Sequence, residues 1–124
     1  MLSVNLKRKY RRVEQIYNMT HRLIDSIKQS DYYRNYHECL KTLKKKKDVY
    51  ERFNQFRRQY YALTKDGQEN FSEIEKLQQE YHALLVDTDV VEFMDVEDKV
   101  CAVMKDMYDT IAEGLEFDMD FMEG

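Results

Sequence analysis

Cysteine and histidine are the residue types in this chain best suited to hold a metal or attack a substrate, and both are few. Cys39 and Cys101 are far apart, and neither has a second cysteine at the spacing of a redox pair or a zinc knuckle. The three histidines form no HExxH or Glu-x-x-His pattern, which would put two ligands on one helix face. The sequence therefore predicts no metal and no cofactor in a single chain, and we expect both cysteines to be small buried apolar side chains.

Acidic pairs are the next candidates for chemistry. Asp87 with Asp89, and Glu97 with Asp98, are explained better by helix capping and solvated charge than by a general acid and its base. The sequence contains neither a glycine-rich phosphate loop nor a nucleophile elbow. We therefore predict no catalytic residue, and we expect a protein that works by binding and is not an enzyme.

Tyrosines beside basic residues indicate a binding surface. Six of the ten tyrosines lie between positions 32 and 61, in a stretch that also holds four consecutive lysines. This composition fits a surface on which single-stranded nucleic acid stacks, and it also fits the aromatic anchors of a protein interface. Several of these tyrosines share a helical stripe with leucine and phenylalanine, which favours helix packing over RNA binding.

Charge is divided between the two halves of the chain. Residues 1–65 carry 17 Lys and Arg against 6 Asp and Glu, a net charge of +11. Residues 66–124 carry 3 against 18, a net charge of -15, and the whole chain has -4. This division favours basic helices beside acidic ones, within one subunit or between subunits. A basic face left free would attract polyanions. Residues 1–12 are a candidate basic arm, which is either a solvated terminus or a contact to RNA or to a neighbouring subunit.

The composition indicates long helices. The 124 residues include no Pro, no Trp and only three Gly, so signals for turns are rare. Hydrophobic residues make up 43% of the chain, enough for one folded domain. No apolar stretch approaches the ~20 residues of a membrane span, and no signal-peptide core follows the first charges, so we expect a cytoplasmic protein without membrane insertion.

Apolar residues recur at spacings of three and four and predict an all-α fold of about five helices with no β-sheet. The expected helices are 13–29, 31–46, 48–65, 72–86 and 90–116. The apolar run that ends at Leu43 and the run that starts at Val49 differ in phase, which predicts two helices or one helix with a break near Lys47. The short loop around Gly67 predicts an antiparallel hairpin.

Capping residues mark the ends of these helices. The expected caps are Ser30, Asp48 with Glu51, Ser72 with Glu75, Asp89 with Glu92, and Gly67 at a C-terminus. A single helical domain should therefore cover residues 13–116. The acidic and apolar tail at 117–124 is either frayed helix or a segment that becomes ordered on a partner.

The closing helix would be ~40 Å long, which is long for a monomer of this size. Its apolar stripe and a second one in the middle of the chain are more than thin helices can bury, and an exposed patch of that area is unusual for a monomer. We therefore predict self-association as a dimer, or a mixed oligomer with related chains. The predicted interface residues are Phe53, Phe56, Tyr60, Phe93, Val100, Met104 and Met107.

Residue patterns in both halves resemble the YlbF/YmcA family of small helical bacterial proteins. The first half contributes Ser30-Asp31-x-Tyr33-x-x-Tyr36, Leu40-Lys41-x-Leu43-x4-Asp48 and Phe53-x-x-Phe56-Arg57. The second half contributes Glu75-x-Leu77-Gln78, Val90-Val91-x-Phe93, Glu97 and Ile111-Ala112. The resemblance covers roughly residues 13–115 and rests on diffuse helix-packing patterns.

The resemblance implies an all-helical domain without enzymatic activity that associates with itself or with related proteins. It implies a regulatory role in competence, sporulation or biofilm development, in some members within a complex that influences mRNA processing by a membrane-bound ribonuclease. Some assemblies of the family carry iron–sulfur clusters, but Cys39 and Cys101 alone cannot form a four-thiolate site within one chain. We predict a non-catalytic regulatory or adaptor protein; the alternative is an RNA-binding module that uses the basic, tyrosine-rich first half.

Overall fold

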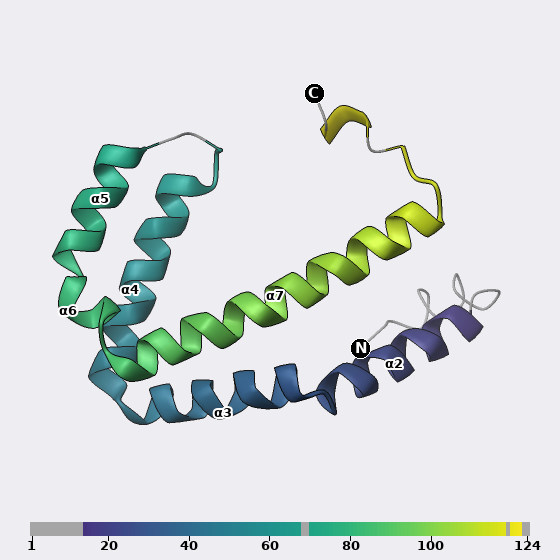
Figure 1. The fold of residues 1–124 in the computed structure, drawn as a ribbon, viewed down its shortest axis with the longest axis horizontal. Coiled ribbons are helices and arrows are strands. Elements are labelled where there is room, and N and C mark those ends of the chain that lie inside the picture. Colours follow the sequence, from purple (N-terminus) through teal and green to yellow (C-terminus); the bar gives the residue numbers. More distant parts are fainter. Residues whose placement is uncertain (1–13, 68–69, 119, 123–124) are drawn as a thin grey trace, which may run out of the picture. The chain divides into compact units, whose positions relative to one another are not determined.

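Helices dominate the computed structural model, which describes residues 14–67, 70–118 and 120–122 (Figure 1). They are α2 (Glu14–Lys28), α3 (Asp31–Lys45), α4 (Lys47–Thr64), α5 (Phe71–Glu80), α6 (His82–Leu85), α7 (Thr88–Gly114) and the 3-10 helix η2 (Asp120–Met122). The all-α class is confirmed, and these described residues contain no β-strand. The predicted basic arm at 1–12 lies outside them. The chain forms two compact units, residues 1–34 and 35–124.

The first unit centres on α2. The helix has a strong apolar stripe, yet none of its residues is buried. Ser30 separates α2 from α3, because its Oγ donates a hydrogen bond to the Ile27 carbonyl at 2.6 Å and accepts one from the Tyr33 amide at 3.3 Å. The predicted cap at Ser30 is therefore confirmed.

In the second unit, α3 and α4 are separate helices. The chain leaves helical geometry at Lys46, where φ is -93° and ψ is 76°. This confirms the break that the change of apolar phase predicts. The predicted cap of α4 is wrong, because Lys46 occupies the N-cap position and makes no side-chain cap hydrogen bond. Asp48 lies inside the first turn instead, where the helix dipole favours its carboxylate.

The antiparallel hairpin is confirmed, since α4 and α5 run side by side in opposite directions (Figure 1). Gly67 turns the chain with a φ of +68°, as its predicted C-terminal position requires. Asn70 joins the two helices by donating a side-chain hydrogen bond to the Leu63 carbonyl at 2.9 Å. The predicted capping box of Ser72 is wrong, because α5 begins at Phe71 and its N-cap, Asn70, makes no side-chain cap hydrogen bond.

The single helix expected over 72–86 is interrupted at Tyr81. The backbone there has φ -102° and ψ 19°, although the Tyr81 amide still donates to the Leu77 carbonyl at 3.1 Å. The tyrosine ring is buried 5.6 Å from the ring of Phe56, and its hydroxyl accepts a hydrogen bond from Gln59 at 2.9 Å. The chain therefore bends at Tyr81, whose ring and hydroxyl group both contact residues of α4.

Asp87 caps α7 and also connects its start to the α3–α4 break. Its Oδ1 accepts hydrogen bonds from the amides of Asp89 at 2.9 Å and Val90 at 3.2 Å. The cap predicted at Asp89 is therefore wrong, and the helix begins two residues earlier than expected. The Oδ2 of Asp87 is 2.8 Å from the Lys46 Nζ, which is also 3.0 Å from Asp89. The hydrogen bond from Lys46 is the main reason that the pKa of Asp87 is below its usual value.

The core lies where α3, α4 and α7 meet. Its four most buried side chains are Leu43, Phe53, Val90 and Phe93, none more than 1% exposed. The Phe53 and Phe93 rings meet edge to face at 5.9 Å, and Tyr36 packs on Phe93 at 5.4 Å. Because this core includes α7 only as far as Val96, the second half of the helix lies beyond it.

The end of α7 is closed by backbone hydrogen bonds. The amide of Glu116 donates to the Glu113 carbonyl at 3.1 Å, and that of Phe117 donates to the Ala112 carbonyl at 3.2 Å. Glu116 is left-handed, with φ 56°, and this pattern is a Schellman motif with glutamate where glycine is usual. The chain therefore turns away from the helix axis, and the helix expected to reach residue 116 stops at Gly114.

We expect Asp87→Ala to lower the free energy of unfolding by about 1–2 kcal/mol, because it removes the cap of α7 together with the link to Lys46. Asp87→Asn keeps a capping oxygen and should lose less. The lowered pKa means that the stabilisation by the carboxylate is complete above about pH 4 and is lost as the pH falls further. Urea unfolding of the three proteins at pH 7 and pH 3 measures this, and a difference between wild type and Asp87→Asn that does not narrow at pH 3 contradicts it.

Candidate interaction surfaces

The structure places the predicted interface residues partly in the core and partly on the surface. Phe53, Phe56 and Phe93 are buried within the chain itself. The other four lie toward solvent: Val100 and Met107 are half-buried, whereas Tyr60 and Met104 are exposed. A helical stripe shows that residues share a face, but it does not show which part of that face another helix of the same chain will cover.

An exposed apolar seam follows the second half of α7. We call it the α7 stripe, and it consists of Cys101, Met104, Tyr108, Ile111 and Leu115. Spacings of three, four, three and four place these residues on one face, as in the seam of a coiled coil. Met104, Tyr108, Ile111 and Leu115 are between 49% and 59% exposed. Figure 1 shows this half of α7 extending away from the α4–α5 hairpin. Tyr108 is absent from the predicted interface, although its spacing from Met104 identifies it.

A second apolar seam lies on α2. We call it the α2 stripe, and it consists of Ile16, Leu23, Ile24 and Ile27. The first three are between 40% and 63% exposed, and the fourth is half-buried. The sequence predicts the helix and its apolar side correctly. The structure adds that no residue of α2 becomes buried within the described chain.

The cysteines differ from each other. Cys39 is half-buried on α3, where burial raises the pKa of its thiol and the carboxylates of Glu92 and Asp89 raise it further. A thiol with a raised pKa is a poor nucleophile. Cys101 is exposed on α7 and Cys39 is only half-buried, so the prediction that both cysteines are buried is wrong. In the described part of the chain, no three His, Cys, Asp or Glu residues are grouped so that they could hold a metal ion.

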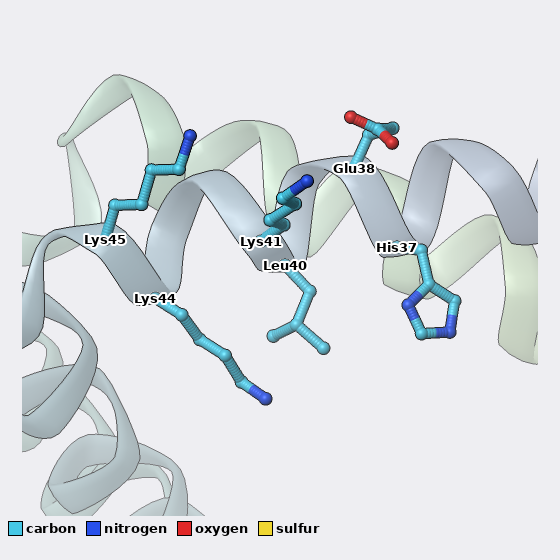
Figure 2. Close-up of a pocket in the computed structure, with 6 residues that line it drawn as sticks. All are labelled: His37, Glu38, Leu40, Lys41, Lys44 and Lys45. Atoms are coloured by element: carbon cyan, nitrogen blue, oxygen red, sulfur yellow. The ribbon is translucent and has the colours of Figure 1, made fainter.

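A basic hollow lies on α3, and we call it the α3 hollow. It has a volume of about 490 Å³ and is lined by His37, Glu38, Leu40, Lys41, Lys44 and Lys45. Figure 2 shows Leu40 and Lys44 on one side of the helix and Lys41 and Lys45 on the other. The hollow thus combines an apolar side chain with three ammonium groups. The run of lysines in the sequence indicates the charge, and the spacing of four residues places Leu40 beside Lys44 on the helix.

Ion pairs between the basic and the acidic half are few among the described residues. Lys46 pairs with Asp87 and Asp89, and Arg57 lies 3.4 Å from Glu97. Arg57 also stacks 4.6 Å from the centre of the Phe53 ring. The remaining ion pairs between described residues join neighbours on one helix. Among the described residues, most basic side chains of the first half are therefore not paired with acidic side chains of the second half.

These features define a small all-helical protein whose distinctive surfaces are two apolar seams and one basic hollow. A family model described as control of competence regulator ComK, YlbF/YmcA, matches residues 16–116. The match covers most of the chain, so the protein belongs to the YlbF/YmcA family, as the resemblance predicts, and its family has a regulatory role in competence. No curated protein and no solved structure matches the chain. Across the described residues, no helix is both long and apolar enough to cross a membrane.

The division between core and surface on α7 can be tested by truncating two side chains. Phe93→Ala should lower the free energy of unfolding by about 3–5 kcal/mol, because it leaves a cavity at the contact with Phe53. Val91→Ala is the matched control on the same helix, and since Val91 is exposed we expect a change within about 0.5 kcal/mol. Chemical unfolding measures both. Equal losses for the two variants would mean that Phe93 is not in the core.

Proposed function

We propose that the protein is a non-catalytic regulatory subunit that acts by associating with itself and with protein partners. The observation that supports this most directly is the α7 stripe, an apolar seam with coiled-coil spacing that lies beyond the core. Soluble monomers rarely expose a contiguous apolar surface of this kind. Packing against a second helix would remove the seam from water and add stability in proportion to the apolar area covered.

A second copy of the chain is the simplest partner to pack against the α7 stripe. In a twofold dimer, the α7 stripe of one subunit would pack on that of the other, and the α2 stripe would add apolar surface. A related chain with a similar apolar helix could cover the α7 stripe in the same way and would give a mixed oligomer. Within this proposal the protein acts in the cytoplasm in competence, sporulation or biofilm control, alone or as part of a ribonuclease-associated complex.

RNA binding by the basic, tyrosine-rich first half has less support. Tyr36 packs against Phe93 in the core, and Tyr50 is half-buried with Lys44 5.8 Å above its ring. Both rings are thus partly covered within the chain, which leaves less of their surface for a base to stack on. Tyr32 and Tyr61 are exposed, but they belong to different helices, α3 and α4. The lysines of the α3 hollow could still attract a polyanion such as RNA.

Met104→Asp tests the proposed self-association. A carboxylate in the α7 stripe would be desolvated in the interface, so the variant should remain folded and become monomeric. Ala102→Asp is the matched control, because Ala102 is exposed on α7 and lies about 140° around the helix from the stripe. It should remain associated. Sedimentation velocity at micromolar concentration gives the mass, and circular dichroism confirms the helix content.

Phe56→Asp should behave differently from Met104→Asp. Phe56 is buried in the core of the chain itself, so a carboxylate there should unfold the protein. The proposal is wrong if wild type sediments as a monomer at micromolar concentration, or if Met104→Asp and Ala102→Asp associate equally well.

A further inference from the structure

The C-terminal tail carries acidic and aromatic residues that nothing in the fold covers. Its described part is residues 116–118 and 120–121, and it contains Glu116, Asp118 and Asp120. Phe117 and Phe121 are 61% and 78% exposed. The Schellman motif at the end of α7 turns this segment away from the helix axis. Two large aromatic rings are thus presented to solvent between carboxylates.

The α3 hollow has the opposite character. Leu40 is half-buried and lies on the same side of α3 as Lys44, whereas Lys41 and Lys45 extend on the other side together with Glu38 (Figure 2). Among the described residues, these three lysines make no ion pair with a carboxylate. An acidic segment with an aromatic side chain matches this surface in charge and in apolar contact. A phenyl ring could cover Leu40 while carboxylates approach the lysines.

The tail cannot reach the hollow of its own chain. Cys39 and Thr42 of α3 line one small cavity together with Asp89 and Glu92 of α7, which fixes α3 beside the start of α7. From Glu92 to Leu115 the continuous helix spans about 35 Å. From Leu115 to Phe121 an extended chain covers only about 20 Å. A tail that fills the hollow must therefore come from another molecule.

We propose that the α3 hollow binds the acidic, phenylalanine-bearing C-terminal tail of a second copy of this chain. The inference rests on the proposed self-association, because the occupant is another subunit, but it uses a surface separate from the α7 stripe. The tail supplies the carboxylates of Asp118 and Asp120 and the ring of Phe121. The hollow supplies Leu40 and the lysines. Because the charges are exposed, the contact should weaken as salt rises.

The chain lacks tryptophan, so Phe121→Trp places a single tryptophan in the tail of the full-length protein. Its emission should shift to shorter wavelength, and iodide should quench it less, as the protein concentration rises and tails dock. Lys41→Glu with Lys44→Glu in this background replaces attraction by repulsion. We expect the protein concentration at which half of the tails are docked to rise about tenfold or more. Lys47→Glu with Lys65→Glu is the control: both lysines are exposed, lie outside the hollow and give the same change of charge.

A charge exchange makes the test specific. The variant with Asp118→Lys and Asp120→Lys should fail to dock on unaltered hollows. Mixed with the variant carrying Lys41→Glu and Lys44→Glu, it should regain docking, because each tail then meets a hollow of opposite charge. Loss of docking caused only by unfolding would not be reversed by mixing. Recovery in the mixture therefore identifies the tail and the hollow as partners.

The proposal is overturned if the protein sediments as a dimer while the tryptophan remains fully exposed; the proposed function would then stand. If wild type is monomeric and no docking occurs, both are wrong. If Lys41→Glu with Lys44→Glu leaves the emission unchanged but abolishes binding of a labelled single-stranded RNA, the hollow binds RNA and the tail is not its occupant. If docking is unchanged in the mixture and in each variant alone, another surface holds the tail.

Discussion

The edge-to-face contact between Phe53 and Phe93 is the constraint on which the second unit depends. It fixes α4 against α7, and Tyr36 packs on the same Phe93 ring to bring α3 to the crossing. Phe93 lies in the second turn of a helix of 27 residues. The core therefore anchors α7 at one end only. Because α3 and α4 contact α7 close to its start, the second half of the helix lies beyond them, and most of its side chains are exposed, although Ala112 is buried.

The position of the aromatic core also determines which charged residues form ion pairs between helices. Lys46 and Arg57 sit at the rim of the core, so they are brought to carboxylates of α7 by packing that the aromatic residues impose. Exposed ion pairs of this kind contribute little by themselves. The lysines of the α3 hollow and the carboxylates of Asp118 and Asp120 are too far from each other to meet within one chain. Among the described residues no charged side chain is buried, so their charge lies on the surface rather than in the core.

Much of the fold follows from local sequence signals, whereas the site does not. The break at Lys46 follows from the phase of the apolar runs, and the hairpin follows from the turn at Gly67. Helix caps are harder to predict, because both Asp87 and Asp89 are suitable N-cap residues near the start of α7. The structure has Asp87 as the N-cap, since the helix begins at the residue that follows it. The bend at Tyr81 has no signal, since the apolar stripe runs through it and the anchoring partner, Gln59, comes from another helix. Phe93 and the α7 stripe follow the same apolar periodicity along α7, so only tertiary neighbours place Phe93 in the core and leave Met104 exposed.

This separation has a consequence for regulation. Residues such as Met104 and Ile111 lie beyond the core, so in the proposed dimer a change at either position would alter association without creating a cavity in the folded subunit. A chain that regulates by contact can then adjust its affinity for a partner independently of its own stability. The helix between core and tail acts as a rigid spacer of fixed length, which prevents the tail from occupying the hollow of its own subunit. Because that intramolecular contact is excluded by distance, the acidic tail and the basic hollow are both available for association between chains.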